Sequence, residues 1–243
     1  MINLLKTHPF FADKQIVSCS RLENQGYCNE NYLVVADGVK YIVRKLLRDD
    51  IDRAFEWKVQ NLAYGQGITA EPLAFDEENG FMVFAFLEGE HKSVEVESLL
   101  PLKVKSQSRG GTKVTTSESD LKLLAQTLQK LHSITIDAKP IELQIDSSVI
   151  EEYPKEYVLC HNDLNPQNIF FSDDVKFIDW EYAGVNDRYF DLACVCVEFG
   201  LAGERVRVFL EAYFEDENYS LEKLEAYKII YQTLCEEWFQ YNR

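Results

Sequence analysis

Short runs of apolar positions, separated by turn residues, mark the first third of the chain and predict strands. Residues 31–36 and 39–46 form two such runs, and Asp37-Gly38 between them is typical of a hairpin turn. Residues 81–87 form a third run that is almost wholly apolar, which predicts a buried strand. Residues 49–64 instead repeat apolar side chains at helical spacing, with Gly65 as a stop. The stripe expected to be buried consists of Ile51, Phe55, Val59 and Leu62.

After residue 88 the apolar spacing becomes helical. Residues 119–132 predict an amphipathic helix capped by Ser117 or Ser119, and another helix is expected to begin near Ser220. Residues 103–118 are basic, small and polar, and predict a surface loop. We therefore expect two lobes, residues 1–88 built on an antiparallel sheet and residues 89–243 made mainly of helices.

Composition and charge exclude several classes of protein. The 243 residues are 46% hydrophobic and 13% aromatic, which argues against disorder. The formal net charge of −16 argues against a nucleic-acid-binding surface, because phosphate neutralisation needs clustered Lys and Arg, and it favours a cationic substrate. The six cysteines include no C-x-x-C pair, no apolar run reaches a membrane span of about 18 residues, and the N-terminus lacks signal-peptide features. A cytoplasmic protein without membrane or nucleic-acid partners is expected.

Residues 161–169, followed by residues 177–181, contain the side chains that phosphoryl transfer needs. Asp163 would lie beside the acceptor hydroxyl, while Asn168 and Asp179 would hold Mg²⁺ against nucleotide phosphates. The apolar pairs at 169–170 and 177–178 predict a hairpin that carries Asp179 at its end. Glu181 is expected on the same side of an extended segment as Asp179, where it would bind a second Mg²⁺.

These motifs resemble those of the aminoglycoside phosphotransferase and choline kinase superfamily, which shares the protein kinase fold. The resemblance rests on His-x-Asp-x-x-x-x-Asn at 161–168, Ile-Asp-Trp-Glu-Tyr-Ala-Gly at 178–184 and Phe-Asp-Leu-Ala at 190–193. The second motif is most similar to the bacterial choline kinase branch. The resemblance implies an α+β, two-lobed kinase-like fold, with nucleotide binding in the small lobe and catalysis in the larger one. It also implies an ATP- and Mg²⁺-dependent kinase that phosphorylates a hydroxyl, most closely that of choline.

The resemblance also implies roles for residues of the small lobe. Arg44, late in the strand at 39–46, takes the place of the phosphate-contacting basic residue, and Glu56 on the next helix would orient it. Lys45 is the rival for this role. Asn29 ends the turn expected to cover the phosphates, and Phe84 and Phe86 complete the expected nucleotide-binding set. In the larger lobe, His161 is expected to hold the loop backbone and Asp191 to order the catalytic loop.

Choline carries a permanent positive charge and no N–H donor, so aromatic faces and carboxylates must recognise it. The resemblance implies an acceptor site that consists of Asp163, Glu181, Tyr182, Glu198 and Trp238. Trp238 fits a core position of the last helix equally well.

Other activities stay open at this stage. A related kinase would act on ethanolamine, thiamine or an aminoglycoside, and a protein of another class would bind a nucleotide without turnover. The chain is shorter than similar enzymes between His132 and His161 and after Trp238. A homodimer in which the partner completes the pocket therefore also stays open.

Overall fold

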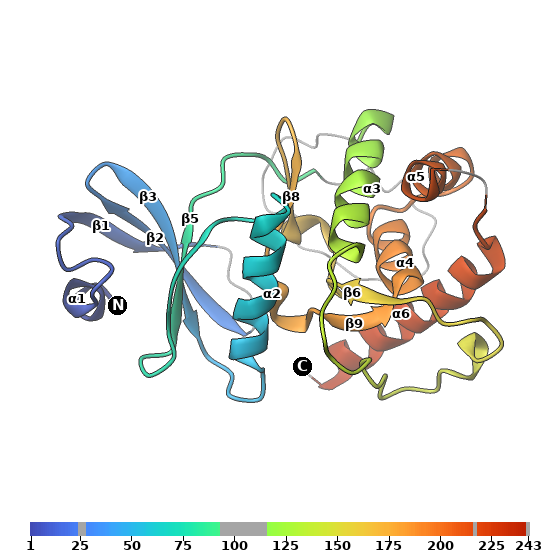
Figure 1. Ribbon diagram of the computed structural model, residues 1–243, viewed down its shortest axis with the longest axis horizontal. Coiled ribbons are helices and arrows are strands. Elements are labelled where there is room, and N and C mark those ends of the chain that lie inside the picture. The colour runs from blue at the N-terminus through green and yellow to red at the C-terminus, as the bar shows by residue number, and fades with distance from the viewer. Residues whose placement is uncertain (24–27, 93–115, 216–217, 242–243) are drawn as a thin grey trace. The chain divides into compact units, whose positions relative to one another are not determined.

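The computed structural model describes residues 1–23, 28–92, 116–215 and 218–241. The chain divides into two compact units, Met1–Glu88 and Gly89–Arg243 (Figure 1). The predicted loop at 103–118 lies outside the described residues except for its last three, and so does most of the turn before Asn29. No helix in the described part of the chain combines the length and apolar character needed to cross a membrane.

The first unit is built on one antiparallel sheet. Its strands follow the order β1-β2-β3-β5-β4, with the bounds β1 Ile16–Arg21, β2 Asn29–Ala36, β3 Val39–Leu46, β4 Pro72–Asp76 and β5 Phe81–Ala85. Asp37 and Gly38 have φ values of 50° and 77°, the left-handed pair that a tight hairpin between β2 and β3 requires. The predicted hairpin and the buried third strand are confirmed.

Both faces of this sheet are covered, because side chains alternate between them along each strand. Phe81 and Val83 of β5 pack on one face with residues around helix α1 (Ile2–Thr7), among them Leu5 and Phe11. Met82 and Phe84 point to the other face, where Trp57 of helix α2 (Arg53–Gly65) packs against them. Arg44 shares this second face, since β3 alternates in the same way.

Helix α2 differs from its prediction in its first residue and in the face that is buried. Asp52 caps it by accepting a hydrogen bond from the backbone N–H of Phe55, so residues 49–51 precede the helix. The buried positions are Glu56, Val59, Gln60 and Ala63, whereas Phe55 and Leu62 are half-buried. The predicted stripe was correct at Val59 only, because it was chosen from apolar residues and so omitted the buried Glu56 and Gln60.

The second unit is mainly helical and contains two short antiparallel pairs of strands. Helix α3 packs against α5, and α4 packs against α6 (Figure 1). Strand β6 pairs with β9, and β7 pairs with β8. The elements are α3 Glu118–His132, η1 Ser148–Ile150, β6 Tyr157–Cys160, η2 Pro166–Asn168, β7 Ile169–Phe171, β8 Val175–Phe177, η3 Trp180–Tyr182, β9 Gly184–Asp187, α4 Arg188–Glu198, α5 Glu204–Phe214 and α6 Leu221–Tyr241.

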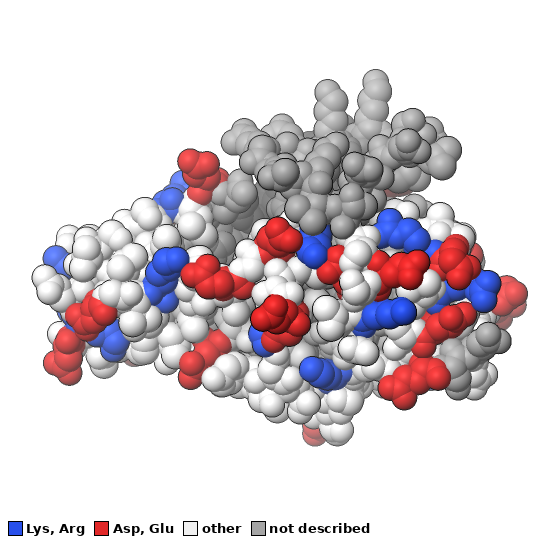
Figure 2. Space-filling view, turned by 90° about the horizontal axis from the view of Figure 1, so that it is seen from above, with Lys and Arg blue, Asp and Glu red and all other residues white. Residues whose placement is uncertain are grey.

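Local signals predicted two helices of this unit well. Ser117 caps α3 in a capping box with Asp120, and its apolar stripe is fully buried, as predicted. The helix expected from about Ser220 is α6. On the face drawn in Figure 2, acidic and basic side chains are interspersed over the described residues, so this face carries no basic patch.

Candidate functional site

The loop between β6 and β7 holds Asp163 by its own amide side chains. Asn168 donates from Nδ2 to the backbone oxygen of Asp163 at 2.9 Å and to its Oδ2 at 2.8 Å. Asn165 donates from Nδ2 to the other carboxylate oxygen at 3.0 Å. Both oxygens of Asp163 therefore accept a hydrogen bond, which fixes the side chain. The bonds of Asn168 also bring the two ends of this loop together.

A buried carboxylate on helix α4 anchors the start of this loop. This carboxylate, that of Asp191, accepts hydrogen bonds from the backbone N–H groups of His161 and Asn162, each with a nitrogen-to-oxygen distance of 2.8 Å. His132 of α3 lies with Nε2 3.1 Å from the same carboxylate, and its Nδ1 lies 2.6 Å from the Tyr213 hydroxyl. Asn162 has a φ of 65°, a left-handed conformation that these bonds stabilise. Asp191 orders the loop, as predicted, and His132 is a structural partner with both ring nitrogens hydrogen-bonded.

His161 joins the loop to the segment before Asp179. Its Nδ1 accepts the backbone N–H of Asp163 at 3.3 Å, so Nε2 carries the proton and donates to the Ile178 carbonyl at 2.9 Å. The residue is fully buried. It holds two backbone segments together, as the sequence predicted.

The hairpin of β7 and β8 brings Asp179 to the same end as Asn168. Ile169 pairs with Phe177, and the Ile178 N–H donates to the Asn168 carbonyl at 2.9 Å, which continues the ladder one residue further. Asp179 follows directly, with a φ of 69°. The predicted hairpin is confirmed, and Asp163, Asn168 and Asp179 gather in one place.

The pKa of the Asp163 carboxyl is consistent with the proximity of Asp163 and Asp179. Burial raises the pKa of the Asp163 carboxyl above its ordinary value, and the negative charge of Asp179 adds to the rise. His161 and the amide hydrogen bonds lower this pKa, but the net direction is upward. A carboxylate with a raised pKa is a better proton acceptor than an ordinary aspartate.

The donor chemistry at this end of the hairpin suits a magnesium ion. The Nδ2 group of Asn168 is used on Asp163, so its Oδ1 is the atom left to act as a ligand. Asp179 adds a carboxylate, and Mg²⁺ prefers such oxygen ligands. The geometry predicted for Glu181 was wrong, because Trp180–Tyr182 form a 3₁₀ turn rather than an extended segment. The alternation argument therefore fails, and metal binding by Glu181 stays a prediction.

Besides Asp163, the predicted acceptor residues lie on three elements of the same unit, η3, α4 and α6. Glu198 ends α4 and accepts a hydrogen bond from the Tyr231 hydroxyl at 2.8 Å. Burial raises the pKa of the Glu198 carboxyl, Tyr231 lowers it, and the Asp163 charge raises it again, so Asp163 and Glu198 are electrostatic neighbours. Tyr182 is 36% exposed in the 3₁₀ turn. Trp238 is half-buried on α6, seven residues after Tyr231 and thus on the same helix face.

In the first unit, the predicted pair of Arg44 and Glu56 is present and buried. Arg44 donates from Nη1 to Glu56 at 3.1 Å, and the side chains of both are less than a tenth exposed. Arg53, one turn before Glu56, donates to its other oxygen at 2.7 Å. Asn31 accepts from Arg44 Nε at 3.3 Å. Lys45 is exposed on the opposite face and pairs with half-buried Glu30, which disfavours it as the rival.

The other predicted nucleotide residues lie close to Arg44 in the sheet. Asn29 is buried and shares its face, because it pairs with Leu46 two residues along β3. Phe84 is buried with its ring centre 5.7 Å from the Arg44 guanidinium. Phe86 follows β5, and its ring lies 4.7 Å from the Lys40 ammonium. Their contact with a nucleotide stays a prediction.

Three residues that support these sites were not predicted from sequence. Arg53 is recognisable afterwards by its spacing of three residues from Glu56 on a helix. Asn165 lies within the motif around Asp163, where an amide is well placed to bond a neighbouring carboxylate. Tyr231 is separated from Glu198 by 33 residues, and no local signal connects the two.

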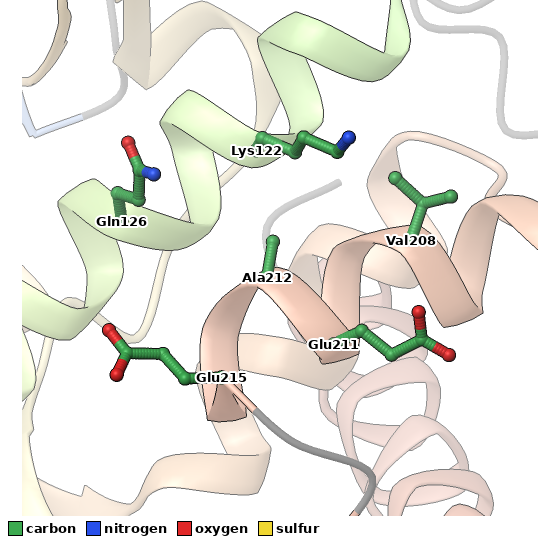
Figure 3. A pocket seen from close by; sticks show the side chains of 6 residues that line it. All are labelled: Lys122, Gln126, Val208, Glu211, Ala212 and Glu215. Atoms are coloured by element: carbon green, nitrogen blue, oxygen red, sulfur yellow. The ribbon is translucent and has the colours of Figure 1, made fainter.

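A hollow outside these residues lies between α3 and α5 (Figure 3). Its volume is about 360 Å³, and its lining consists of Lys122, Gln126, Val208, Glu211, Ala212 and Glu215. Glu211 already pairs with Arg207, and Glu215 accepts a hydrogen bond from Gln129. The hollow brings together none of the predicted site residues.

Comparison with known proteins agrees with the fold and the motifs. The protein LicA of Haemophilus influenzae is 28% identical over 214 residues, which cover 79% of this chain and 62% of LicA. The match thus spans about three fifths of that relative's length. A choline/ethanolamine kinase family protein from Mesorhizobium loti superposes with a TM-score of 0.70 at 22% identity, covering 96% of this chain and 81% of that one.

The choline kinase LicA from Streptococcus pneumoniae superposes with a TM-score of 0.68 at 23% identity, covering 98% of this chain and 89% of that chain. The predicted α+β kinase-like fold is confirmed. A model of the phosphotransferase enzyme family matches residues 21–227, most of the chain. The chain therefore belongs to the phosphotransferase enzyme family.

Proposed function

We propose that this protein is an ATP-dependent kinase that transfers the γ-phosphoryl group to the hydroxyl of a small cationic amino alcohol, choline in the first place. The observation that carries the proposal is the position of the Asp163 carboxylate. The side-chain amides of Asn165 and Asn168 fix it, and Asp179 and Glu198 are its electrostatic neighbours. Membership of the phosphotransferase family and the similarity to LicA support it.

Asp163 is proposed as the residue that activates the acceptor. Its carboxylate would orient the hydroxyl and accept its proton as the phosphoryl group is transferred. Asn165 and Asn168 fix the carboxylate, so little reorganisation precedes this step. Asp191 contributes indirectly, since it holds the backbone just before Asp163.

Asn168 and Asp179 would hold Mg²⁺, with Glu181 as a further candidate ligand. The bound ion supplies positive charge that offsets the charge of the nucleotide phosphates. In the first unit, Arg44 is proposed to contact a phosphate, since Glu56 and Asn31 fix its guanidinium. Asn29, Phe84 and Phe86 are proposed to complete the nucleotide site.

Two neighbouring carboxylates favour a cationic acceptor. Burial raises the pKa of both carboxyls, the Asp179 charge adds to the rise at Asp163, and the Asp163 charge adds to the rise at Glu198. A positive charge beside them would stabilise both in the ionised form. An ammonium group bound beside them would supply this charge, whereas a neutral sugar would not. Tyr182 and Trp238 would add aromatic faces for a quaternary ammonium. Ethanolamine, thiamine and aminoglycosides carry positive charge as well and are the alternatives.

The test is acceptor phosphorylation by the purified protein with MgATP, measured for choline, ethanolamine, thiamine and an aminoglycoside. We expect choline to give the highest kcat/KM and Asp163→Asn to reduce turnover by orders of magnitude with ATP binding retained. Asp174→Asn is the matched control, because Asp174 is an exposed aspartate on the β7–β8 turn. Nucleotide binding without phosphorylation of any acceptor would favour a binding module instead. Homodimer formation and a cytoplasmic location stay predictions of the sequence.

A further inference from the structure

Tyr231 on helix α6 is a buried side chain whose hydroxyl is directed at the proposed acceptor site. Only 6% of the residue is exposed, and its ring packs edge-on against Phe190 with centroids 5.9 Å apart. The hydroxyl donates to Oε1 of Glu198 at 2.8 Å. Packing thus fixes the ring and, with it, the position of the hydroxyl oxygen. Tyr231 is therefore a rigid support for the Glu198 carboxylate.

Helix α4 relates Glu198 to the catalytic loop. Asp191 and Glu198 are seven residues apart, which is two helical turns, so they lie on the same face of the helix. Asp191 holds the loop that carries Asp163, and the Asp163 charge reaches Glu198. The separation of the two carboxylates therefore depends on where the Glu198 side chain is held.

The groups around Glu198 explain why it needs this support. Asp163 faces it from the catalytic loop, the Cys194 thiol from its own helix, and Tyr231 and the Cys235 thiol from α6. Both thiols are in hydrogen-bond contact with Tyr231, and burial raises the pKa of each, so both are neutral. Among these neighbours, only the Tyr231 hydroxyl lowers the pKa of Glu198.

We propose that Tyr231 is a positioning residue for acceptor binding, which holds the Glu198 carboxylate ionised and in place for the ammonium group of the substrate. The inference rests on the proposed function, which it deepens by naming the residue that sets the preference for cationic acceptors. Tyr231 acts through Glu198 and need not touch the substrate.

The first test is Tyr231→Phe, which keeps the ring against Phe190 and removes only the hydroxyl. We expect the KM for choline to rise about ten- to hundredfold, the scale of one hydrogen bond to a charged group, while kcat and the KM for ATP change less than about twofold. Tyr227→Phe is the matched control. Tyr227 lies one turn earlier on α6 and is also buried, but its hydroxyl accepts a hydrogen bond from Lys155 at 3.4 Å and donates to Asp187 rather than to Glu198.

The second test is the pH dependence of the choline KM. Cation binding requires ionised Glu198, so the KM rises as the pH falls through the pKa of this group. Removing the Tyr231 hydroxyl removes a contribution that lowers this pKa, so the rise should begin at a higher pH in Tyr231→Phe than in wild type. In a Glu198→Gln background, Tyr231→Phe should change the KM less than about twofold, because the charge it supports is gone.

Two results would overturn the role of Tyr231. One is a KM in Tyr231→Phe that rises no more than in Tyr227→Phe, and the other is a full effect that persists with Glu198→Gln. If wild type phosphorylates no amine, the proposed function fails separately. Binding of tetramethylammonium, measured by calorimetry, then decides about Tyr231: weaker binding in Tyr231→Phe than in Tyr227→Phe supports its role, and equal or absent binding overturns it.

Discussion

The replacement of Asp191 by Asn tests whether the catalytic loop depends on a carboxylate that touches no substrate. Asp191 accepts hydrogen bonds from three donors. These are the backbone N–H groups of His161 and Asn162 and the Nε2–H group of His132. An Asn side chain keeps the shape but turns one oxygen into an NH₂ group, which would face a donor whichever way the amide is oriented. At least one buried N–H therefore loses its acceptor.

The magnitude follows from these contacts. A hydrogen bond to a charged group contributes about 1.5–3 kcal/mol, and a buried donor left without an acceptor adds its own desolvation cost. We expect Asp191→Asn to lower the free energy of unfolding by about 2–4 kcal/mol, or roughly 5–10 °C in Tm for a chain of this size. Because Asn162 needs this support for its left-handed backbone, Asp163 should shift and kcat fall about hundredfold.

Three measurements check this expectation: thermal unfolding, kinetics with choline and MgATP, and hydrogen exchange at the amides of His161 and Asn162. Exchange of these two amides should accelerate, while the KM for ATP stays within about threefold. Tyr213→Phe is the graded control, since it removes only the far end of the chain of contacts, 2.6 Å from His132. A kcat within threefold of wild type in Asp191→Asn would refute the reasoning.

Three further predictions follow from the same geometry. Arg44→Ala should raise the KM for ATP tenfold or more in steady-state kinetics, whereas Lys45→Ala should leave it unchanged, because only Arg44 is held on the α2 face of the sheet. In Mg²⁺ titrations Asp179→Ala should need more Mg²⁺ for half-maximal activity than Asn168→Ala, since it removes a charged ligand; equal requirements would contradict the assignment. Burial raises the pKa of Cys235 to about 11, so iodoacetamide should label it at pH 8 about hundredfold more slowly than a free cysteine, and its rate should rise about tenfold per pH unit towards pH 11.

Local rules were sufficient for much of the fold. The hairpin at Asp37-Gly38 requires only turn residues with left-handed backbone, and the start of α3 requires only a Ser followed by an acidic residue three positions later. The motif that contains Asp163 and Asn168 placed both in one short loop, whose ends the Asn168 side chain joins. Such features depend on neighbours along the chain, and those neighbours are visible in the sequence.

The predictions that were wrong or missing depended on which face of an element would be buried. The apolar stripe chosen for α2 excluded Glu56, yet Glu56 is 1% exposed because Arg44 and Arg53 neutralise it from two directions. Glu181 was placed by strand alternation, but the left-handed backbone of Asp179 ends the extended segment and begins a turn.

The sequence by itself determined the order of the motifs proposed for catalysis and the residue types that phosphoryl transfer would need, and it predicted two lobes. Only the tertiary structure decided their partners: Tyr231 for Glu198, Asp191 and His132 for the loop, and Arg53 for Glu56. The physical reason is the range of the interactions. Helices, turns and motif spacing depend on residues a few positions apart, whereas a buried carboxylate is stabilised by whichever donors packing brings to it from elsewhere in the chain.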